Sequence, residues 1–196
     1  MSAEPLVRVV DDDGSFARSL ARLLGARGFL VRTFSSGAEL LAELSGEARG
    51  CVVMDLKMPG MNGLDLQSEL AHRGLRLPVV FLTGAADIPS SVRAMRGGAV
   101  DFLEKRAPSE HLIAAVERAL ACERDQRNLR ERFARLTERE LEVLRHVVRG
   151  RMNKQIAADL GIHERTVKLH RTAVTAKVGV RSVAELTTLA RDAGIV

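Results

Sequence analysis

The stretch CVVMDLKMPGMNG, residues 51–63, decides the fold of this chain. It begins with four apolar residues, 51–54, and an acid, Asp55, follows them directly. A short apolar run between turn signals is typical of a strand that is buried on both faces. Residues 79–82 form a second run of this kind. Such strands occur in parallel sheets that helices cover on both sides, so this type of sheet is predicted.

Strand and helix patterns alternate along the first part of the chain. Further strands are predicted at 6–10, 29–34 and 100–103. Apolar residues at helical spacing predict helices at 15–27, 36–44, 63–72, 88–96 and 109–120. Five strand–helix units predict an α/β domain with a doubly wound, five-stranded parallel sheet of the flavodoxin-like class. In such open sheets the ligand site lies beyond the carboxyl ends of the strands.

Charge divides the chain into two parts. Residues 1–123 contain 14 Lys and Arg against 16 Asp and Glu, a formal charge of −2. Residues 124–196 contain 16 against 9, a formal charge of +7. Basic surface attracts nucleic acid, anionic membranes or no partner at all, so charge alone leaves these alternatives open. The content of hydrophobic residues, 46%, argues against a disordered chain.

The C-terminal part is predicted to be all helical. Residues 124–135 are highly charged without Gly or Pro, which predicts a helical linker between domains at 1–123 and 136–196. Thr137-x-x-Glu140 and Ser182-x-x-Glu185 both fit the capping box that opens a helix. Two further helices are expected at 153–160 and 164–178, which gives a four-helix domain.

Two negative signals favour a cytoplasmic protein without membrane contact. No apolar run approaches the roughly 20 residues that span a bilayer. The first residues lack the basic start and long apolar stretch of a signal peptide. Cys51 and Cys122 lie far apart and in no metal-type spacing, so we expect neither a disulfide framework nor a cysteine metal site.

Carboxylates follow two of the predicted strands. Asp11, Asp12 and Asp13 come after the first strand, and Asp55 comes after the third. Carboxylates that lie close together repel one another and need a cation, for which Mg²⁺ or Mn²⁺ is suited. A carboxylate can also attack phosphorus and form an aspartyl phosphate.

Residues that suit a phosphoryl group follow the other strands. Thr83 and Gly84 come after the fourth strand, and Lys105 comes just after the fifth. The hydroxyl and the ammonium can bind phosphoryl oxygens, and the glycine lets the group approach the backbone. Each residue also has a plain structural reading, since an Asp after a strand often caps the next helix. Their occurrence at four strand ends in order favours one shared site.

Residues 1–123 resemble the receiver domain of two-component response regulators. The matching stretches are VVDDD (9–13), MDLKMPGMNG (54–63), FLTGAAD (81–87) and GAVDFLEK (98–105). The resemblance implies that Asp55 is the phosphoacceptor. It also implies a metal site in which Asp12 and Asp55 are direct ligands, Asp11 acts through water and the Lys57 carbonyl completes the set.

The resemblance assigns the remaining residues to phosphate sensing. Thr83, Gly84 and Lys105 would contact the phosphoryl group, and Phe102 matches the switch aromatic, although it could be an ordinary core residue. The family has Pro after the lysine, with a cis bond, where this chain has Arg106. A cis bond before a non-proline residue costs roughly 2.5–4 kcal/mol. The sequence therefore favours a trans bond here, with Lys105 aimed differently.

Residues 136–196 resemble the LuxR-type helix-turn-helix domain, in the arrangement of FixJ/StyR regulators. The matching stretches are LTERELEVL (136–144), NKQIAADLGI (153–162) and RTVKLHRTAVTAKVGVRS (165–182). In a helix-turn-helix the second helix enters the major groove of DNA. The inner face of that helix is predicted to carry Val167, Val174 and Val178.

The outer face of the same helix supplies the candidate DNA contacts. The family presents residues to bases at Lys168, Leu169 and Thr172. The candidates for phosphate contacts, which position the protein without reading sequence, are Asn153, Lys154, Thr166, Arg171 and Lys177. The alternative is a solvated basic helix. His163 stands where the family has a Ser N-cap, so a weaker start of this helix is expected.

Together these features predict a transcription factor, not an enzyme. A sensor histidine kinase would phosphorylate Asp55, and the face formed by residues 88–122 would then pair two copies on double-stranded DNA, with RNA polymerase as a further partner. One alternative is an orphan regulator that binds DNA without phosphorylation. Another, ranked lower, is a phosphatase that uses Asp11-x-Asp13 as its catalytic pair.

Overall fold

The computed structural model describes residues 5–46, 48–84 and 88–195. The chain divides into two compact units, residues 1–123 and 124–196. Helix α5, Ser109–Ala134, runs across the division between them. Within the described residues, none of the helices combines the length and the apolar character that crossing a membrane requires.

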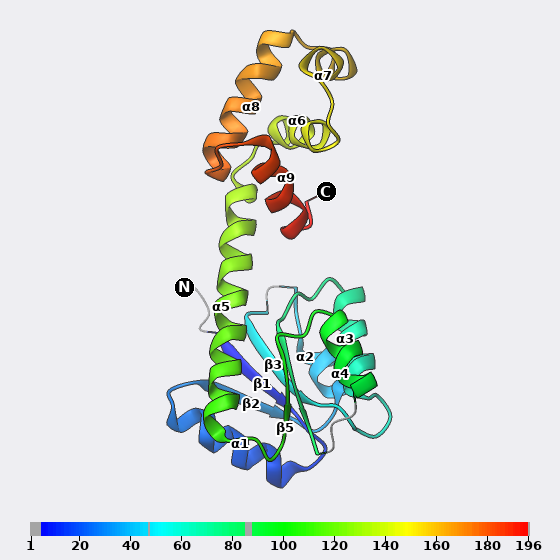
Figure 1. Cartoon of the computed structure of the whole chain (residues 1–196), viewed down its shortest axis with the longest axis vertical. Coiled ribbons are helices and arrows are strands. Elements are labelled where there is room, and N and C mark those ends of the chain that lie inside the picture. Colours follow the sequence, from blue (N-terminus) through cyan, green and yellow to red (C-terminus); the bar gives the residue numbers. More distant parts are fainter. Residues whose placement is uncertain (1–4, 47, 85–87, 196) are drawn as a thin grey trace. The chain divides into compact units, whose positions relative to one another are not determined.

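The first unit is built on one parallel sheet with the strand order β2-β1-β3-β4-β5 (Figure 1). The strands are β1 Leu6–Val10, β2 Leu30–Phe34, β3 Gly50–Asp55, β4 Val79–Thr83 and β5 Asp101–Glu104. The order reverses between β1 and β3, which is where ligands bind in doubly wound sheets. The predicted class, a doubly wound sheet of five parallel strands, is confirmed.

Helices cover both faces of this sheet. They are α1 Gly14–Ala26, α2 Gly37–Glu43, α3 Gly63–His72, α4 Ile88–Arg96 and the first part of α5. One apolar core joins the sheet to α2, α3 and α4, and the other joins it to α1 and α5. Neighbouring residues of β3 alternate between them, with Met54 in the first core and Val53 in the second. This alternation explains why the strand is apolar at every position from 51 to 54.

Gly63 fixes the start of α3 against the end of β3. Its N–H donates to the Leu56 carbonyl at 2.9 Å. A Cβ at this position would lie 2.5 Å from the Asp55 carbonyl oxygen and 2.8 Å from Phe81 Cε1. Such distances are shorter than any normal contact, so glycine is required here to seat the helix directly behind Asp55.

Most predicted elements occur within a residue or two of their expected bounds. Helices α3 and α4 match the predicted ranges, and β3 gains one residue at each end. The helix predicted at 109–120 and the helical linker predicted at 124–135 form one continuous helix, α5, which ends at Ala134. A charged segment without Gly or Pro contains nothing that would stop a helix, so it extends the preceding one.

The second unit contains the helices α6 Glu138–Val148, α7 Asn153–Leu160, α8 Glu164–Val178 and α9 Val183–Asp192. They enclose a third apolar core, to which Phe133 near the end of α5 contributes a ring that is 1% exposed. Burying an aromatic ring of this size contributes roughly 1.5–3 kcal/mol relative to leaving it exposed. The last turns of α5 therefore belong to the core of this unit.

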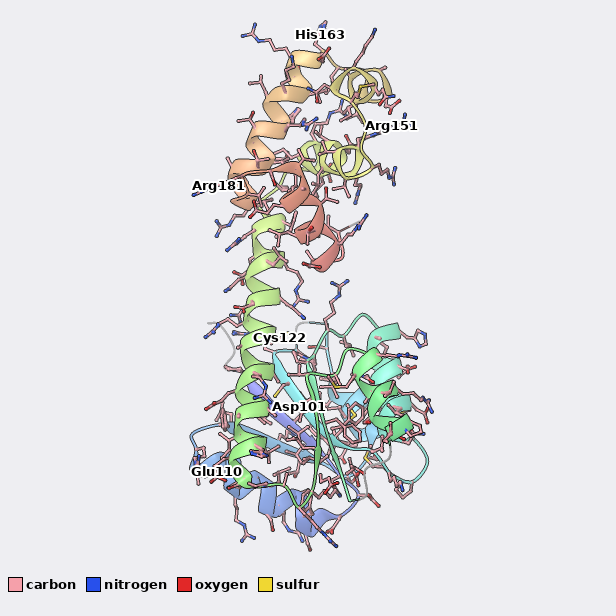
Figure 2. All side chains as sticks on the ribbon, viewed as in Figure 1. Asp101, Glu110, Cys122, Arg151, His163 and Arg181 are labelled. Atoms are coloured by element: carbon pink, nitrogen blue, oxygen red, sulfur yellow. The ribbon has the colours of Figure 1, made fainter. Side chains whose placement is uncertain are left out.

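One predicted capping box is complete and the other forms only in part. At α6, Glu140 N–H donates to Thr137 Oγ1 at 3.3 Å and the Glu140 carboxylate accepts from Thr137 N–H at 2.7 Å. At α9, Ser182 Oγ accepts from Glu185 N–H at 3.1 Å. The Glu185 carboxylate accepts instead from the N–H of Arg181, labelled in Figure 2, so the expected return bond to Ser182 is corrected. The residue before the cap offers the better-placed donor.

Candidate functional site

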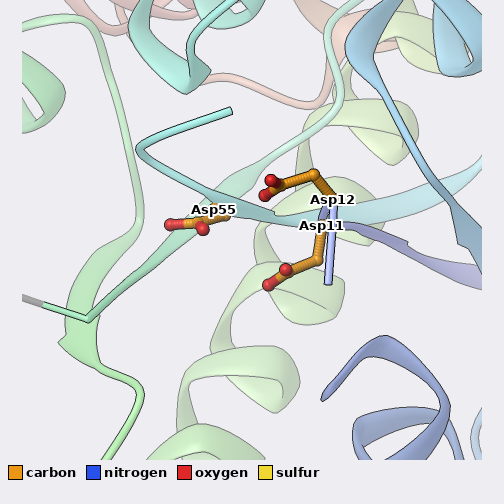
Figure 3. Close-up of side chains that lie close together, drawn as sticks. All are labelled: Asp11, Asp12 and Asp55. Atoms are coloured by element: carbon orange, nitrogen blue, oxygen red, sulfur yellow. The ribbon is translucent and has the colours of Figure 1, made fainter. Parts of the chain in front are cut away.

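Three carboxylates meet where β1 and β3 end. Asp11 and Asp12 follow β1, and Asp55 is the last residue of β3 (Figure 3). Each offers an oxygen within 4.8 Å of the others. Asp11 and Asp55 are 2% and 7% exposed, whereas Asp12 is open to solvent. Acids from the two strand ends therefore converge as predicted, in a site that is buried at Asp11 and Asp55 and open to solvent at Asp12.

Asp13 does not join this group. Its carboxylate accepts hydrogen bonds from Ser15 N–H at 2.9 Å and Phe16 N–H at 3.1 Å, so it caps α1. These bonds to backbone amides of Phe16 and Ser15 lower the pKa of Asp13. Asp13 therefore has the plain structural role that the sequence left open for an acid after a strand, which is to cap the next helix. The phosphatase alternative thereby loses its second carboxylate, because Asp13 faces helix amides.

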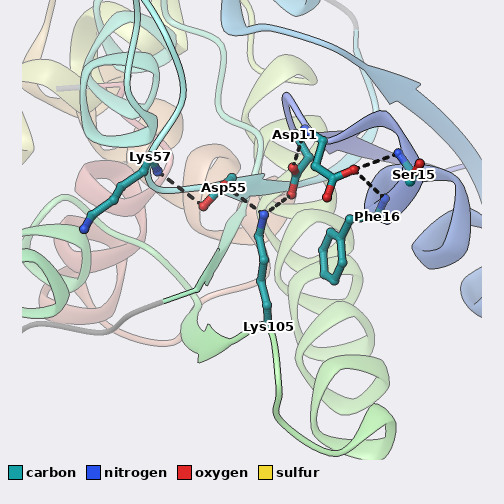
Figure 4. A network of polar contacts seen from close by, with 7 residues as sticks. Asp11, Ser15, Phe16, Asp55, Lys57 and Lys105 are labelled. Atoms are coloured by element: carbon teal, nitrogen blue, oxygen red, sulfur yellow. Dashed lines mark hydrogen bonds and ion pairs between the residues drawn. The ribbon is translucent and has the colours of Figure 1, made fainter.

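Lys105 places its ammonium between two of the acids. Its Nζ lies 2.7 Å from Asp11 Oδ2 and 2.9 Å from Asp55 Oδ2 (Figure 4). The same atom stands 4.6 Å from the centroid of the Phe16 ring, a distance at which the ring attracts the cation. Phe16 was not singled out from the sequence, because an aromatic residue at helical spacing is usually only a core residue.

The electrostatics of the site follow from this geometry. Burial raises the pKa of Asp11, and the hydrogen bond from Lys105 only partly offsets that effect. Burial also disfavours the ammonium of Lys105, but its hydrogen bonds to Asp11 and Asp55 outweigh this and raise its pKa. Lys105 is therefore held in its charged form. The carboxylates together still carry more negative charge than one ammonium can neutralise.

The donor set fits a hard divalent cation. Mg²⁺ prefers carboxylate oxygens, carbonyl oxygens and water, and it is usually held by one or two carboxylates. Three carboxylates with excess negative charge meet that requirement. Lys57, whose carbonyl the sequence adds to the set, lies at the site as well, since its N–H donates to Asp55 Oδ1 at 3.2 Å.

The bond between Lys105 and Arg106 is trans. None of the peptide bonds among the described residues is cis. The sequence favoured this geometry, with Lys105 aimed differently as its consequence. The lysine nevertheless reaches both carboxylates, and its N–H donates to the Thr83 carbonyl at 2.8 Å. The residue after β5 is thus held to the end of β4 by a backbone hydrogen bond, with Arg106 in the place of the family's proline.

The other candidates for phosphate sensing lie on β4 and β5. Thr83, the last residue of β4, is fully buried. A Cβ at Gly84 would meet no described atom within 4 Å, so packing does not require glycine there. Phe102 is half-buried, and its ring centroid lies 6.0 Å from that of Phe81. This contact fits a core residue and a switch residue equally well.

In the second unit, α8 has the two faces that its sequence predicts. Val167, Val174 and Val178 are at most 1% exposed and face the core. Lys168, Thr172 and Leu169 are exposed on the outside, and Leu169 is 65% exposed. A large apolar side chain left in water on a basic helix suits contact with an apolar group of a partner, such as a thymine methyl.

Some of the candidate phosphate contacts already bind another side chain of the protein. Arg171 Nη1 donates to Asn153 Oδ1 at 2.7 Å, which joins the start of α7 to α8. Lys177 Nζ lies 2.6 Å from Glu140 Oε2, in contact with a carboxylate that is almost fully buried. Lys154 and Thr166 lie in the first turns of α7 and α8. Lys177 therefore already has a structural partner inside its own domain.

The helices α7 and α8 begin without a side-chain cap. His163, labelled in Figure 2, and Met152 occupy the N-cap positions, and neither accepts a bond from the first turn of its helix. His163 is thus the poorer cap that the sequence predicts, and the weaker start of the helix stays a prediction. The N-caps described for α1, α2, α3, α6 and α9 all accept such a bond through their side chains.

Comparison with known proteins agrees with both halves of this description. Residues 7–117 match the family described as "Response regulator receiver domain". Residues 134–190 match the family described as "Bacterial regulatory proteins, luxR family". This chain is a response regulator with a LuxR-type DNA-binding domain.

Relatives resemble this response regulator along its whole length. Nodulation protein W of Bradyrhizobium diazoefficiens is 42% identical over 99% of this chain and 88% of its own. The transcriptional regulatory protein FixJ of Rhizobium meliloti is 40% identical over 96% of each chain. The solved structure of the response regulator StyR has 43% identity and a TM-score of 0.62, with coverage of 96% of this chain and 99% of that one.

Two supporting residues of this response regulator were also missed from the sequence. Glu140 was predicted only as part of a capping box, yet it also binds Lys177. Gly63 was quoted as part of a receiver motif without its packing role behind Asp55. Neither role leaves a local signal, because both depend on a residue distant in the chain.

Proposed function

We propose that this regulator receives a phosphoryl group on Asp55 from a sensor histidine kinase and in response binds double-stranded DNA as a homodimer. The observation that carries the proposal is the contact of one ammonium, on Lys105, with the carboxylates of both Asp11 and Asp55. A carboxylate flanked by a second acid and a lysine at a strand end suits phosphoryl transfer, which depends on positioning and charge neutralisation.

The transfer step requires little beyond placement. An oxygen of Asp55 attacks phosphorus, and a P–O bond forms as the P–N bond to the donor histidine breaks. The electron pair of that bond stays on the histidine nitrogen. Asp55 serves as nucleophile through a carboxylate that the Lys57 N–H and the Lys105 ammonium hold in place.

A divalent cation, Mg²⁺ or Mn²⁺, would neutralise charge on the reacting oxygens. We infer that Asp12 and Asp55 hold it directly, that Asp11 acts through water and that the Lys57 carbonyl completes the set. The exposure of Asp12 beside the buried Asp11 supports this division, since the outer carboxylate is open to an incoming ion. Removal of the cation should stop transfer while leaving the fold intact.

After transfer, we expect the phosphoryl oxygens to bind the Lys105 ammonium, the Thr83 hydroxyl and the backbone at Gly84. Thr83 and Phe102 would then shift, altering the surface formed by residues 88–122. That surface carries unpaired apolar side chains on α4, since Ile88, Val92 and Met95 are 80%, 42% and 48% exposed. These residues support the expectation that two receivers pair there.

On DNA, we expect the outer face of α8 to read bases through Lys168, Leu169 and Thr172. Asn153, Lys154, Thr166 and Arg171 would bind phosphates, and the uncapped first turns of α7 and α8 would add backbone N–H donors. We assign the receiver to residues 1–123, the linker to 124–135 and the output domain to 136–196. The regulator would act in the cytoplasm on transcription by RNA polymerase and would not turn over a substrate.

Intact mass spectrometry tests the phosphoryl step. The full chain is incubated with acetyl phosphate and Mg²⁺, beside the variant Asp55→Asn and beside the wild type with EDTA. We expect a gain of one phosphoryl group in the wild type with Mg²⁺ only. A gain that persists in Asp55→Asn would refute the assignment of the acceptor.

Light scattering and DNA binding test the output. The phosphorylated wild type should double in mass and bind a target duplex more tightly, whereas Asp55→Asn should do neither. Unchanged mass on phosphorylation would remove the dimer from the proposal. Equal DNA affinity of the wild type and Asp55→Asn, with and without phosphodonor, would favour the orphan regulator.

A further inference from the structure

The second unit has a concave surface away from its helix-turn-helix. It is lined by Arg145, Val148 and Arg149 at the end of α6 and by Arg191 and Ile195 at the end of α9, and its volume is about 390 Å³. The described residues of α7 and α8 contribute nothing to its lining. We call these five residues the arginine groove.

The three guanidinium groups of the arginine groove lack an internal partner. All three side chains are exposed, and among the described residues no carboxylate lies within 4.0 Å of them and no side-chain hydrogen bond reaches them. Two other arginines of the same unit are paired, since Arg139 contacts Glu142 at 2.6 Å and Arg151 contacts Asp159 at 3.9 Å. The groove therefore concentrates positive charge that the rest of the unit leaves uncompensated.

This concentration of positive charge does not stabilise the protein in the absence of a ligand. Arg145 and Arg149 stand four residues apart, a spacing at which like charges on a helix repel and destabilise it. Their place at the C-terminal end of α6 offsets part of that cost through the helix dipole. Arg191 then adds a third positive charge from a different helix. The arrangement makes physical sense if an anion supplied from outside completes it.

The floor of the arginine groove is aliphatic. Val148 and Ile195 are half-buried, and both pack against the core of the unit. A groove with an aliphatic floor and a guanidinium rim suits a ligand that alternates apolar side chains with carboxylates. Guanidinium groups bind carboxylates bidentately and are weakly hydrated, which is why arginine is enriched at protein interfaces.

We propose that the arginine groove binds an acidic protein segment that carries aliphatic side chains among its carboxylates. Such a contact goes beyond phosphorylation and DNA binding. DNA is the less suitable occupant, because a phosphate backbone offers no aliphatic group for Val148 and Ile195. Within the unit, α9 packs on α6, and the groove is lined by the ends of these two helices.

NMR of the ¹⁵N-labelled full chain tests the proposal with a synthetic peptide of 14 residues that alternates paired Glu and paired Leu. A second peptide with Gln in place of Glu is the neutral control. We expect the acidic peptide to shift the amide signals of residues 145–149 and 191–195. The triple variant Arg145→Ser, Arg149→Ser and Arg191→Ser should bind it at least tenfold more weakly.

A charge-matched variant separates the groove from general attraction to a basic protein. The triple change Arg124→Ser, Arg135→Ser and Arg181→Ser removes the same charge from exposed sites of the same unit. It should weaken peptide binding less than threefold. Equal weakening in both triple variants, or signal shifts outside the groove, would overturn the proposal. The amide spectrum of each variant also reports whether it is folded.

DNA binding by the same proteins distinguishes the competing occupant. Both triple variants should lose affinity for a 30-base-pair duplex to the same extent, because they lose the same charge. A larger loss in the groove variant would assign the arginine groove to DNA and overturn our proposal. If the wild type failed to bind any duplex even after phosphorylation with acetyl phosphate and Mg²⁺, the proposed function would fail, and the peptide result would still decide the groove.

Discussion

Replacement of Lys177 by methionine should destabilise the second unit, because Lys177 is a structural partner of Glu140. Its Nζ lies 2.6 Å from Glu140 Oε2, and the two side chains are 37% and 7% exposed. Methionine keeps most of the aliphatic chain and removes the charge and the donor. The change therefore isolates the ion pair from the packing of the side chain.

The magnitude lies between two limits. Exposed ion pairs contribute roughly 0.2–1 kcal/mol, and a hydrogen bond to a charged group contributes about 1.5–3 kcal/mol. Glu140 is nearly buried but keeps its bond from Thr137 N–H at 2.7 Å, so it is not left without a partner. We expect Lys177→Met to lower the free energy of unfolding by about 1.5 kcal/mol. The control Lys168→Met, whose side chain is 65% exposed with Nζ at 3.7 Å from Glu164, should cost no more than about 0.5 kcal/mol.

Urea unfolding and hydrogen exchange measure the effect in the full chain. The protein has no Trp and no Tyr, so far-UV circular dichroism follows the unfolding. Exchange of the α6 amides reports on the second unit alone. The hydrogen bond from Lys177 is the main cause that lowers the pKa of Glu140 from its ordinary 4.5, and the bond from the Thr137 amide is the second. The stabilisation is therefore present at neutral pH and is lost as the pH falls from 4.5 through the lower pKa of the folded state.

The variant should accordingly differ most from the wild type at neutral pH and least in acid. The reasoning would be refuted if Lys177→Met kept wild-type stability and an unchanged pH profile. If it then lost duplex affinity as strongly as Lys154→Met does, Lys177 would be a phosphate contact, as the sequence suggests.

Three further predictions test the receiver, and urea unfolding, acid unfolding or mass spectrometry of the full chain measures each of them. Gly63→Ala should lower the free energy of unfolding by about 1–3 kcal/mol, because the new Cβ would overlap the Asp55 carbonyl. The control Gly25→Ala, near the end of α1 where a Cβ meets open space, should raise the free energy of unfolding by about 0.5 kcal/mol. Wild-type stability of Gly63→Ala would contradict the packing argument. Asp13→Ala should remove the part of the acid sensitivity that appears as the pH falls from 3.8, since amide bonds lower the pKa of this carboxyl; an unchanged acid midpoint would argue against the cap. Cys51, whose pKa burial raises to about 12, should stay unlabelled by iodoacetamide at pH 8 in the native protein and react in urea; rapid native labelling would show that β3 is open.

The sheet was predictable because two of its strands carry a clear pattern. Residues 51–54 and 79–82 are apolar at every position, and so short an apolar run between turn signals is typical of a strand between two helical layers. The convergence of Asp11, Asp55 and Lys105 then followed from the rule that parallel strands end at one edge. The position of the site was therefore predictable from the order of the strands alone.

The unpredicted features depend on contacts across the chain. Nothing near Lys177 in the sequence indicates Glu140, which lies 37 residues away. The same holds for Phe16 below Lys105. The helical character of residues 124–135 was predicted, but the burial of Phe133 in the third apolar core, which makes the end of α5 part of the second unit, was not.

The position of Lys105 also bears on how a signal can leave the site. Three carboxylates and one ammonium have a formal charge of −2, which a single divalent cation brings to electroneutrality. The proposed phosphorylation of Asp55 would add only about one further negative charge. The site is open to solvent at Asp12, and at physiological salt the field of a solvent-exposed charge is screened over roughly 8 Å. The receiver would therefore have to pass its signal on as a rearrangement of touching atoms, and the electric field of the new group would fade before it reached the surface.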